Sequence, residues 1–244
     1  MKIFRKIRAS SILDHKVSKY LLYAVGEILL VIIGILIAVS INNANEKRKL
    51  RSELQLIYQA VENDLVRDTV VLTDMITQQD YLDSLTHAYL YLERINPDTI
   101  DELNVADCRQ CGALHAVYSK FTPSEGGITS LVDFESRSDL KQDSLSYRIF
   151  DLYASNNKSF EDISDQIAST AVENLKSLEK YDWYSDFGKG EFNKDQVNYF
   201  LTSREYENKL TTFYLLQAGN LSRLLKDYKA ESVALIKEIK RRKK

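Results

Sequence analysis

The sequence predicts an all-α protein: one N-terminal transmembrane helix, followed by an elongated antiparallel helical bundle with long first and last helices. Three observations support this prediction. Residues 20–41 are apolar apart from a single ionisable group, Glu27. The remaining chain repeats apolar residues at helical spacing, and no alternating strand pattern persists. Only 2 Pro and 8 Gly occur in 244 residues, too few for the many turns of an all-β protein.

The apolar stretch is long enough to cross a bilayer, because a helix over residues 20–41 would be roughly 33 Å long. Six Lys or Arg precede it and four follow closely, so the positive-inside rule places the N-terminus in the cytoplasm. Ala38-Val39-Ser40 would suit a signal peptidase, but both the stretch and its leader are long for a cleaved signal. We therefore expect an uncleaved signal-anchor. The expected domains are a basic cytoplasmic leader, a transmembrane helix and a helical extracytoplasmic domain, at residues 1–19, 20–41 and 42–244.

The start of the chain also resembles a known family. The stretch KYLLYAVGEILLVIIGILIA (residues 19–38) and the flank INNANEKRK (residues 41–49) resemble an uncharacterised family of Gram-negative bacterial single-span membrane proteins. The basic leader FRKIR (residues 4–8) fits the same family. Relatives usually place Trp where this chain has Ala44, so one interfacial aromatic anchor is missing. The resemblance implies a single-pass protein of the bacterial inner membrane with a periplasmic C-terminal domain, and it implies no activity.

After the span, we expect one helix from about Glu46 to Ile95, ending before Pro97. Its apolar stripe follows heptad-like spacing and comprises Leu50, Leu54, Ile57, Val61, Leu65, Leu72, Met75, Leu82, Leu85, Tyr89 and Leu92. Such a stripe fits either one face of a helical bundle or a dimeric coiled-coil stalk. We favour the bundle, because three residues off the stripe widen the apolar face: Tyr58, Val66 and Tyr91.

Residues 98–138 form the least regular part of the chain. Short helices are expected there around Ala113–Phe121 and Ser124–Phe134. Helical periodicity returns from Asp139 to Tyr181, with a break expected at Asn156-Asn157.

The C-terminal region is expected to begin with a loop, Asp182–Glu191, which carries the only Trp, Trp183. A capping box at Thr202-Ser203-Arg204-Glu205 then predicts the start of a last helix of about 38 residues. The basic tail could touch anionic headgroups, but a solvated, fraying end is the simpler expectation; it comprises Lys237, Lys240, Arg241, Arg242, Lys243 and Lys244.

Cys108-Arg109-Gln110-Cys111 is the one motif in the sequence whose side chains could carry out a chemical reaction or bind a cofactor. Haem attachment needs His directly after the second Cys, where this chain has Gly112. A thioredoxin-like centre needs a βαβ context, which is not predicted here. A metal site would recruit His115, and His87 with it, but no second ligand pair completes it. We therefore favour a local disulfide in an oxidising periplasm, or two reduced thiols, over redox catalysis.

Glu27 is unusual because a carboxylate within a span costs around 2.5–3.5 kcal/mol at mid-membrane. Helical spacing places it on one face with Tyr23, Gly34 and Ala38, and the last two form a small-xxx-small pair. The face would allow close docking of a partner helix, with Glu27 protonated or paired. Ion coupling through Glu27 is a second interpretation, and a neutral Glu27 that snorkels to the interface is a third.

The remaining composition argues against several function classes. The net charge is −2 even with the basic leader, so the larger part of the chain is acidic and a nucleic-acid partner is not expected. No Ser, Cys or acid stands at triad spacing from a His, and we expect no enzyme, cofactor or metal. The favoured function is a protein-interaction or envelope-sensing module that acts with other membrane or envelope proteins, or with further copies of itself. The alternatives are a membrane subunit of an ion-coupled or transport assembly and a periplasmic thiol oxidoreductase.

Overall fold

The computed structural model describes residues 3–91, 108–138 and 143–242. Every regular element within these ranges is a helix, which confirms the predicted all-α class. The chain divides into two compact units, Met1–Leu54 and Gln55–Lys244. The division falls within the first helix, whereas the domain boundaries at residues 19 and 41 stay predictions.

The first unit is formed by the N-terminal part of helix α1 (Ile3–Leu90). Its apolar stretch after Ala24 is long enough to cross a membrane, and no part of the most apolar segment is buried; Leu30, for example, is 72% exposed. No other helix in the described ranges is both long and apolar enough for this. Length and composition thus agree with the predicted transmembrane helix.

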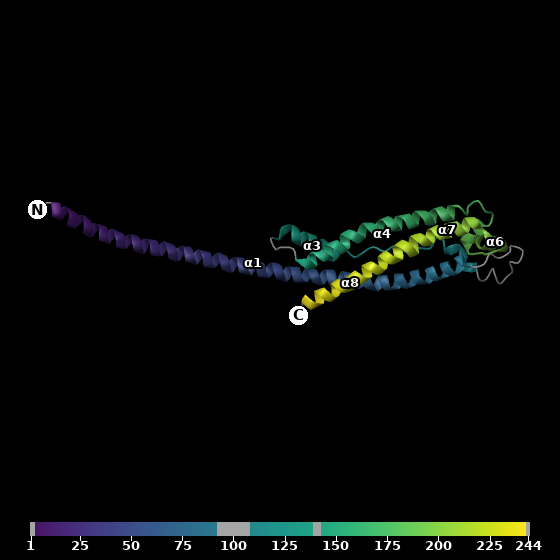
Figure 1. The fold of residues 1–244 in the computed structure, drawn as a ribbon, viewed down its shortest axis with the longest axis horizontal. Helices are drawn as coiled ribbons and strands as arrows, with labels where there is room; N and C mark the ends of the chain where they lie inside the picture. Colours follow the sequence, from purple (N-terminus) through teal and green to yellow (C-terminus); the bar gives the residue numbers. More distant parts are fainter. Residues whose placement is uncertain (1–2, 92–107, 139–142, 243–244) are drawn as a thin grey trace. The chain divides into compact units, whose positions relative to one another are not determined.

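The second unit is an antiparallel bundle. Its long elements are the C-terminal part of α1, helix α4 (Ser144–Lys176) and a final helical run. That run consists of α7 (Arg204–Tyr214), the π-helical segment η3 (Leu215–Leu221) and α8 (Ser222–Arg242). In Figure 1, α8 lies beside α4 and runs in the opposite direction. The predicted bundle with long first and last helices is confirmed.

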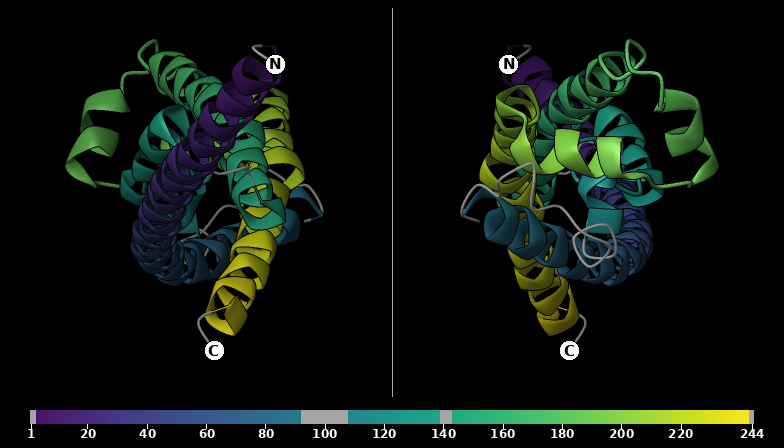
Figure 2. Two further views of the ribbon diagram at one scale, coloured as in Figure 1. Left: turned by 90° about the vertical axis from the view of Figure 1, so that its left-hand side faces the viewer. Right: turned by 90° about the vertical axis from the view of Figure 1, so that its right-hand side faces the viewer.

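Four short elements complete the described part of the second unit. They are the 3₁₀ helix η2 (Cys108–Ala113), α3 (Gly126–Arg137), α5 (Tyr184–Lys189) and α6 (Lys194–Thr202). One short green helix stands out to the side of the long helices in Figure 2, and α6 lies at the same end of the bundle as α7 in Figure 1. A helix at 113–121 was expected, but η2 ends at Ala113 and residues 117–125 are irregular. The prediction of a loop over residues 182–191 is wrong for the middle of that range, because Tyr184–Lys189 form α5.

Two further local predictions are wrong, and both were based on one or a few polar residues: the helix break at Asn156 and the capping box at Thr202. Asn156 does not break α4; its Nδ2 donates to the Leu152 carbonyl at 2.7 Å, within the helix. The capping box is also misplaced. Ser203 is the N-cap of α7 and accepts from the Tyr206 N–H at 3.3 Å, while Thr202 belongs to α6. The reciprocal box stands one helix earlier, between Asn193 and Gln196.

The stripe on α1 packs inward as predicted, and Ile57, Val61, Leu65 and Leu72 are buried. The predicted widening of this face holds for Tyr58, which is buried, but not for Val66 or Tyr91. Both are exposed, Tyr91 at 77%. Helix α1 ends at Leu90, earlier than expected, and Leu92 and Ile95 lie outside the described residues.

Helix α3 is held against α1 through its N-terminus. Its N-cap residue, Glu125, makes no side-chain cap. Instead, two buried carboxylates on α1 accept the free donors: Asp64 from the Gly127 N–H at 2.6 Å, and Asp68 from the Ser124 N–H at 3.0 Å and its hydroxyl at 2.7 Å. Carboxylates are favoured there by both the unpaired N–H groups and the helix dipole.

A close backbone approach accompanies this cap. A Cβ added at Gly127 would lie 2.5 Å from the backbone N and Cα of Val61, nearer than atoms can pack. A Cβ added at Gly126 would meet only the Asp64 carboxylate, at 3.4 Å, which is ordinary contact. The second glycine of the pair therefore sets the distance between α3 and α1.

This contrast predicts different outcomes for two neighbouring substitutions. We expect Gly127→Ala to lower the free energy of unfolding by about 1–3 kcal/mol, because backbone atoms must move apart. Gly126→Ala should leave it unchanged or raise it by up to about 1 kcal/mol through helix propensity. Thermal unfolding of the detergent-solubilised chain, followed by circular dichroism, measures both. Equal shifts for the two variants would contradict the close approach.

Candidate functional site

The candidate site is the disulfide cluster, defined by Cys108, Cys111 and His115 with the aromatic residues around them. Cys108 and Cys111 form a disulfide within η2, with their Cα atoms 5.0 Å apart. A 3₁₀ helix has three residues per turn, so residues three apart share one side of it. The aromatic shell comprises Tyr89, Trp183, Phe187, Tyr199, Phe200 and Tyr206.

The disulfide lies inside this shell and away from solvent. Cys108 is 1% exposed and Cys111 is 8% exposed. Thiol–disulfide exchange requires an incoming thiolate to reach a sulfur atom, and catalytic cysteines are partly exposed for this reason. The geometry therefore suits a packing role for the disulfide better than catalytic exchange.

Side chains from several helices donate to the carbonyls of Cys111 and of the irregular residues that follow η2. The Tyr206 hydroxyl donates to the carbonyl of Cys111. Asn174 on α4 donates to the carbonyl of His115 at 2.7 Å, and Gln217 in η3 donates to that of Val117 at 2.9 Å. Buried backbone acceptors need such partners, and here they come from three separate helical elements. Sequence reasoning missed all three donors; the only signal was polar side chains on otherwise apolar faces.

His115 is fully buried in the same cluster. Its ring stacks edge-on against Tyr206, with ring centroids 5.1 Å apart, and neither ring nitrogen has a hydrogen-bond partner of normal geometry among the described residues. Burial lowers the pKa of His115 to about 4; the positive charge of Lys209 acts in the same direction, and the backbone at Gly112 opposes it. The imidazole is therefore neutral at neutral pH and serves as an aromatic core residue.

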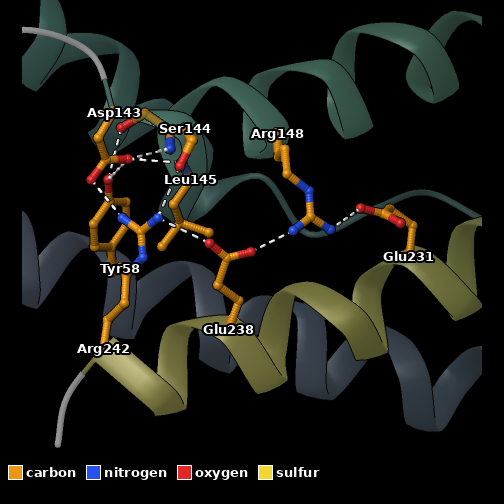
Figure 3. Close-up of polar contacts among 9 residues, drawn as sticks. Tyr58, Asp143, Ser144, Leu145, Arg148, Glu231, Glu238 and Arg242 are labelled. Atoms are coloured by element: carbon orange, nitrogen blue, oxygen red, sulfur yellow. Dashed lines mark hydrogen bonds and ion pairs between the residues drawn. The ribbon is translucent and has the colours of Figure 1, made fainter.

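A second polar arrangement ties α1, α4 and α8 together (Figure 3). Asp143, the N-cap of α4, accepts from the Tyr58 hydroxyl at 2.9 Å and from Arg242 at 2.7 Å. Arg242 also pairs with Glu238, which contacts Arg148, and Arg148 in turn pairs with Glu231. Figure 3 shows these side chains as one continuous chain of contacts between α4 and α8.

This network corrects one expectation about the basic tail. Arg242 was expected to fray in solvent, but it anchors the end of α8, and Lys240 lies 3.8 Å from Glu62. Burial alone would raise the pKa of Asp143, yet the Ser146 N–H, the Tyr58 hydroxyl and Arg242 together lower it. The carboxylate stays charged, which suits a structural ion pair.

The predicted membrane face lies on α1 in the first unit. Glu27 and Ala38 are exposed, and a Cβ added at Gly34 would meet nothing within 4 Å. The Tyr23 side chain lies outside the described residues. His87 stacks on Tyr91 with ring centroids 4.4 Å apart, and no group of three or more metal-ligating side chains occurs in the described part of the chain.

The burial of His115 predicts a specific pH dependence. Its pKa is about 4 when folded and 6.5 for the free side chain, so the unfolded chain binds the proton first as the pH falls. The stability contributed by neutral His115 is complete above pH 6.5 and is lost as the pH falls toward 4. We expect the unfolding temperature to fall more steeply over this range in the wild type than in His115→Leu. His87→Leu, at an exposed site, is the control; parallel curves for the wild type and His115→Leu would contradict the account.

Comparisons with known proteins place the chain in a family without assigning an activity. No curated protein and no solved structure matches it. A family described as a family of unknown function (DUF6090) matches residues 27–160, more than half of the chain. The match includes the predicted membrane face from Glu27 onward, the cysteine pair and helix α3 with its cap. The predicted membership of an uncharacterised family is thereby confirmed, and the chain belongs to the DUF6090 family of unknown function.

Proposed function

We propose that this protein crosses the bacterial inner membrane once, with its N-terminus in the cytoplasm, and that its helical unit acts in the periplasm by binding other proteins or sensing the state of the envelope. The supporting observation is the uncovered apolar surface of α1. A core helix of a soluble protein buries its apolar side chains, whereas Leu30, Leu36 and Ile41 are all more than half exposed. A bilayer is the environment that would cover such a surface on all sides.

Two features support the orientation. The charges before the apolar stretch outnumber those after it, which favours a cytoplasmic N-terminus. The Cys108–Cys111 disulfide is the redox state expected of a cysteine pair in an oxidising compartment such as the periplasm. Both features point to the same side of the membrane for residues 55–244.

A non-enzymatic role is supported by the structural contacts that the potentially reactive side chains make. The cysteines and His115 are buried among aromatic rings, and the ion pairs around Asp143 tie helices together. A thiol oxidoreductase would need sulfur atoms that a substrate can reach, so the buried disulfide disfavours that alternative. Ion coupling through Glu27 would need a second protein to complete a site around an exposed carboxylate. Protein binding or envelope sensing requires neither an accessible sulfur atom nor a completed ion site at Glu27.

A reporter enzyme that is active only in the periplasm tests the orientation directly. Fused after Lys244, it should be active, and fused after Lys19 it should be inactive. The fused chain should also remain with the membrane fraction after washing at high pH, which removes peripheral proteins. The opposite activity pattern would overturn the orientation, and release by the wash would overturn the membrane anchor.

A further inference from the structure

Residues 117–123, which we call the strap, are not helical and run along α4 in the opposite direction. Four contacts mark this course in chain order: His115 with Asn174 at 2.7 Å, Lys120 with Asp165 at 3.7 Å, Phe121 with Phe160 through their rings, and Ser124 with Tyr153 at 3.0 Å. Nine residues of chain (115 to 124) thus follow 21 residues of helix (174 to 153), which is roughly 31 Å. Nine residues span at most about 30–32 Å, so the strap is almost fully extended.

Burial along the strap alternates as it does in a β-strand. Phe121 and Pro123 are buried, whereas Lys120 and Thr122 are exposed. Successive side chains of an extended chain point to opposite sides, so one side of the strap packs on the bundle and the other faces outward. The inward ring of Phe121 also meets Tyr228 of α8, with ring centroids 5.6 Å apart. The strap therefore has the form of a single strand, although no other strand occurs in the described ranges.

The two ends of the strap are tied to the bundle, but the backbone of its middle is not. The Val117 carbonyl accepts from Gln217 at 2.9 Å, and the Ser124 N–H, just after the strap, donates to Asp68 at 3.0 Å. Between these points, the backbone N–H and carbonyl groups of residues 118–122 make no hydrogen bond to any other described residue. A strand edge with free donors and acceptors is a template for pairing with another extended chain.

A pocket of about 610 Å³ lies between the strap and α4. Its buried lining residues are Phe121, Pro123 and Phe160, and its more exposed ones are Lys120, Thr122, Glu125, Asn157, Lys158 and Glu161. Lys158 and Glu161 stand one helical turn apart, yet neither forms an ion pair within the described structure. Charges of both signs are therefore available to a ligand in a pocket of ordinary ligand-binding size.

We propose that this groove, formed by the strap and α4, binds an extended peptide segment of a partner protein. The backbone of the segment pairs with the free groups of the strap, and its side chains reach the charges of Lys158 and Glu161. An added strand lies about 4.8 Å from its neighbour, whereas a helix with its side chains is about 10–12 Å wide. Only an extended chain presents donors and acceptors at the spacing of the strap. The inference names the class of partner for the protein-binding role proposed above, and it rests on that role.

Two proline substitutions distinguish the edges of the strap. Proline fits an extended segment and removes a backbone N–H, and neither Ser119 nor Thr122 donates its N–H to a described residue. Hydrogen-bonding groups of successive strand residues point to opposite edges, so these two N–H groups face opposite ways. Only the edge toward α4 borders the pocket. Ser119→Pro and Thr122→Pro are therefore matched variants, one at the binding edge and the other its control.

The probe is a phage-displayed library of random eight-residue peptides, selected on the detergent-solubilised full-length chain. Recovered peptides are synthesised, and their dissociation constants are measured by fluorescence anisotropy. We expect the dissociation constant to rise about three- to tenfold in one proline variant, because one hydrogen bond is lost, and to change less than about twofold in the other. Methylation of alternate backbone nitrogens of the peptide removes several donors and should weaken binding by more than about tenfold.

Amide hydrogen exchange in the unsubstituted chain provides a second measurement that does not depend on the folding of a variant. Strand addition protects the amides of one edge only, so every second amide of residues 118–122 should exchange more slowly when the peptide is bound.

Equal changes of affinity in the two proline variants, or unchanged exchange across residues 118–122, would overturn the groove as the binding site. If the recovered peptides nevertheless bind, a protein-binding role elsewhere on the chain survives. A library that yields no binding peptide would also overturn the groove. The reporter fusions test the membrane orientation separately, so its failure is distinguished from the failure of the groove.

Discussion

The capping of α3 by the carboxylates of α1 is the interaction on which the second unit depends. Asp68 accepts from Ser124 and, at 3.4 Å, from the Tyr228 hydroxyl of α8, while the Tyr153 hydroxyl of α4 donates to the Ser124 carbonyl at 3.0 Å. Burial raises the pKa of Asp68, and nearby Asp64 raises it further, whereas the hydrogen bonds from Ser124 and Tyr228 oppose this. Four helices therefore meet at one buried polar point, and the hydrogen bonds offset part of the cost of burying the acid.

This cap accounts for the two buried acids on the core-facing side of α1. Asp64 and Asp68 lie there among buried apolar residues of α1, where the backbone of Gly127 comes close to Val61. The ion pair between Asp143 and Arg242 links the start of α4 to the end of α8. At the disulfide cluster, the buried side chains of Asn174 and Gln217 donate to backbone carbonyls of the irregular segment after η2 and so hold it against the helices. Polar side chains thus hold together the parts of the bundle that periodic apolar packing alone does not specify.

Much of this fold could be predicted from the sequence, because many residues contribute to the helical periodicity and to the apolar stretch, and no single residue decides either pattern. The inward stripe of Ile57, Val61 and Leu65 is correct for that reason. Single-residue signals failed at Asn156, whose amide donates to a carbonyl of its own helix, and at Thr202, which belongs to the preceding helix. The cysteine pair could be singled out, but not its burial, since the aromatic rings around it come from distant segments. The pairing of Asp64 with Gly127, 63 residues apart, leaves no local pattern beyond the two adjacent glycines.

Amide hydrogen exchange in Asp68→Ala most directly tests the central role of the α3 cap. The account predicts that the amides of Ser124 and of the first turn of α3 exchange faster than in the wild type, since their acceptor is lost. The amides of α6, which does not contact this carboxylate in the described structure, should keep their protection. Unchanged exchange in α3, or an equal increase throughout the second unit, would contradict the claim that this carboxylate specifically holds α3 in place.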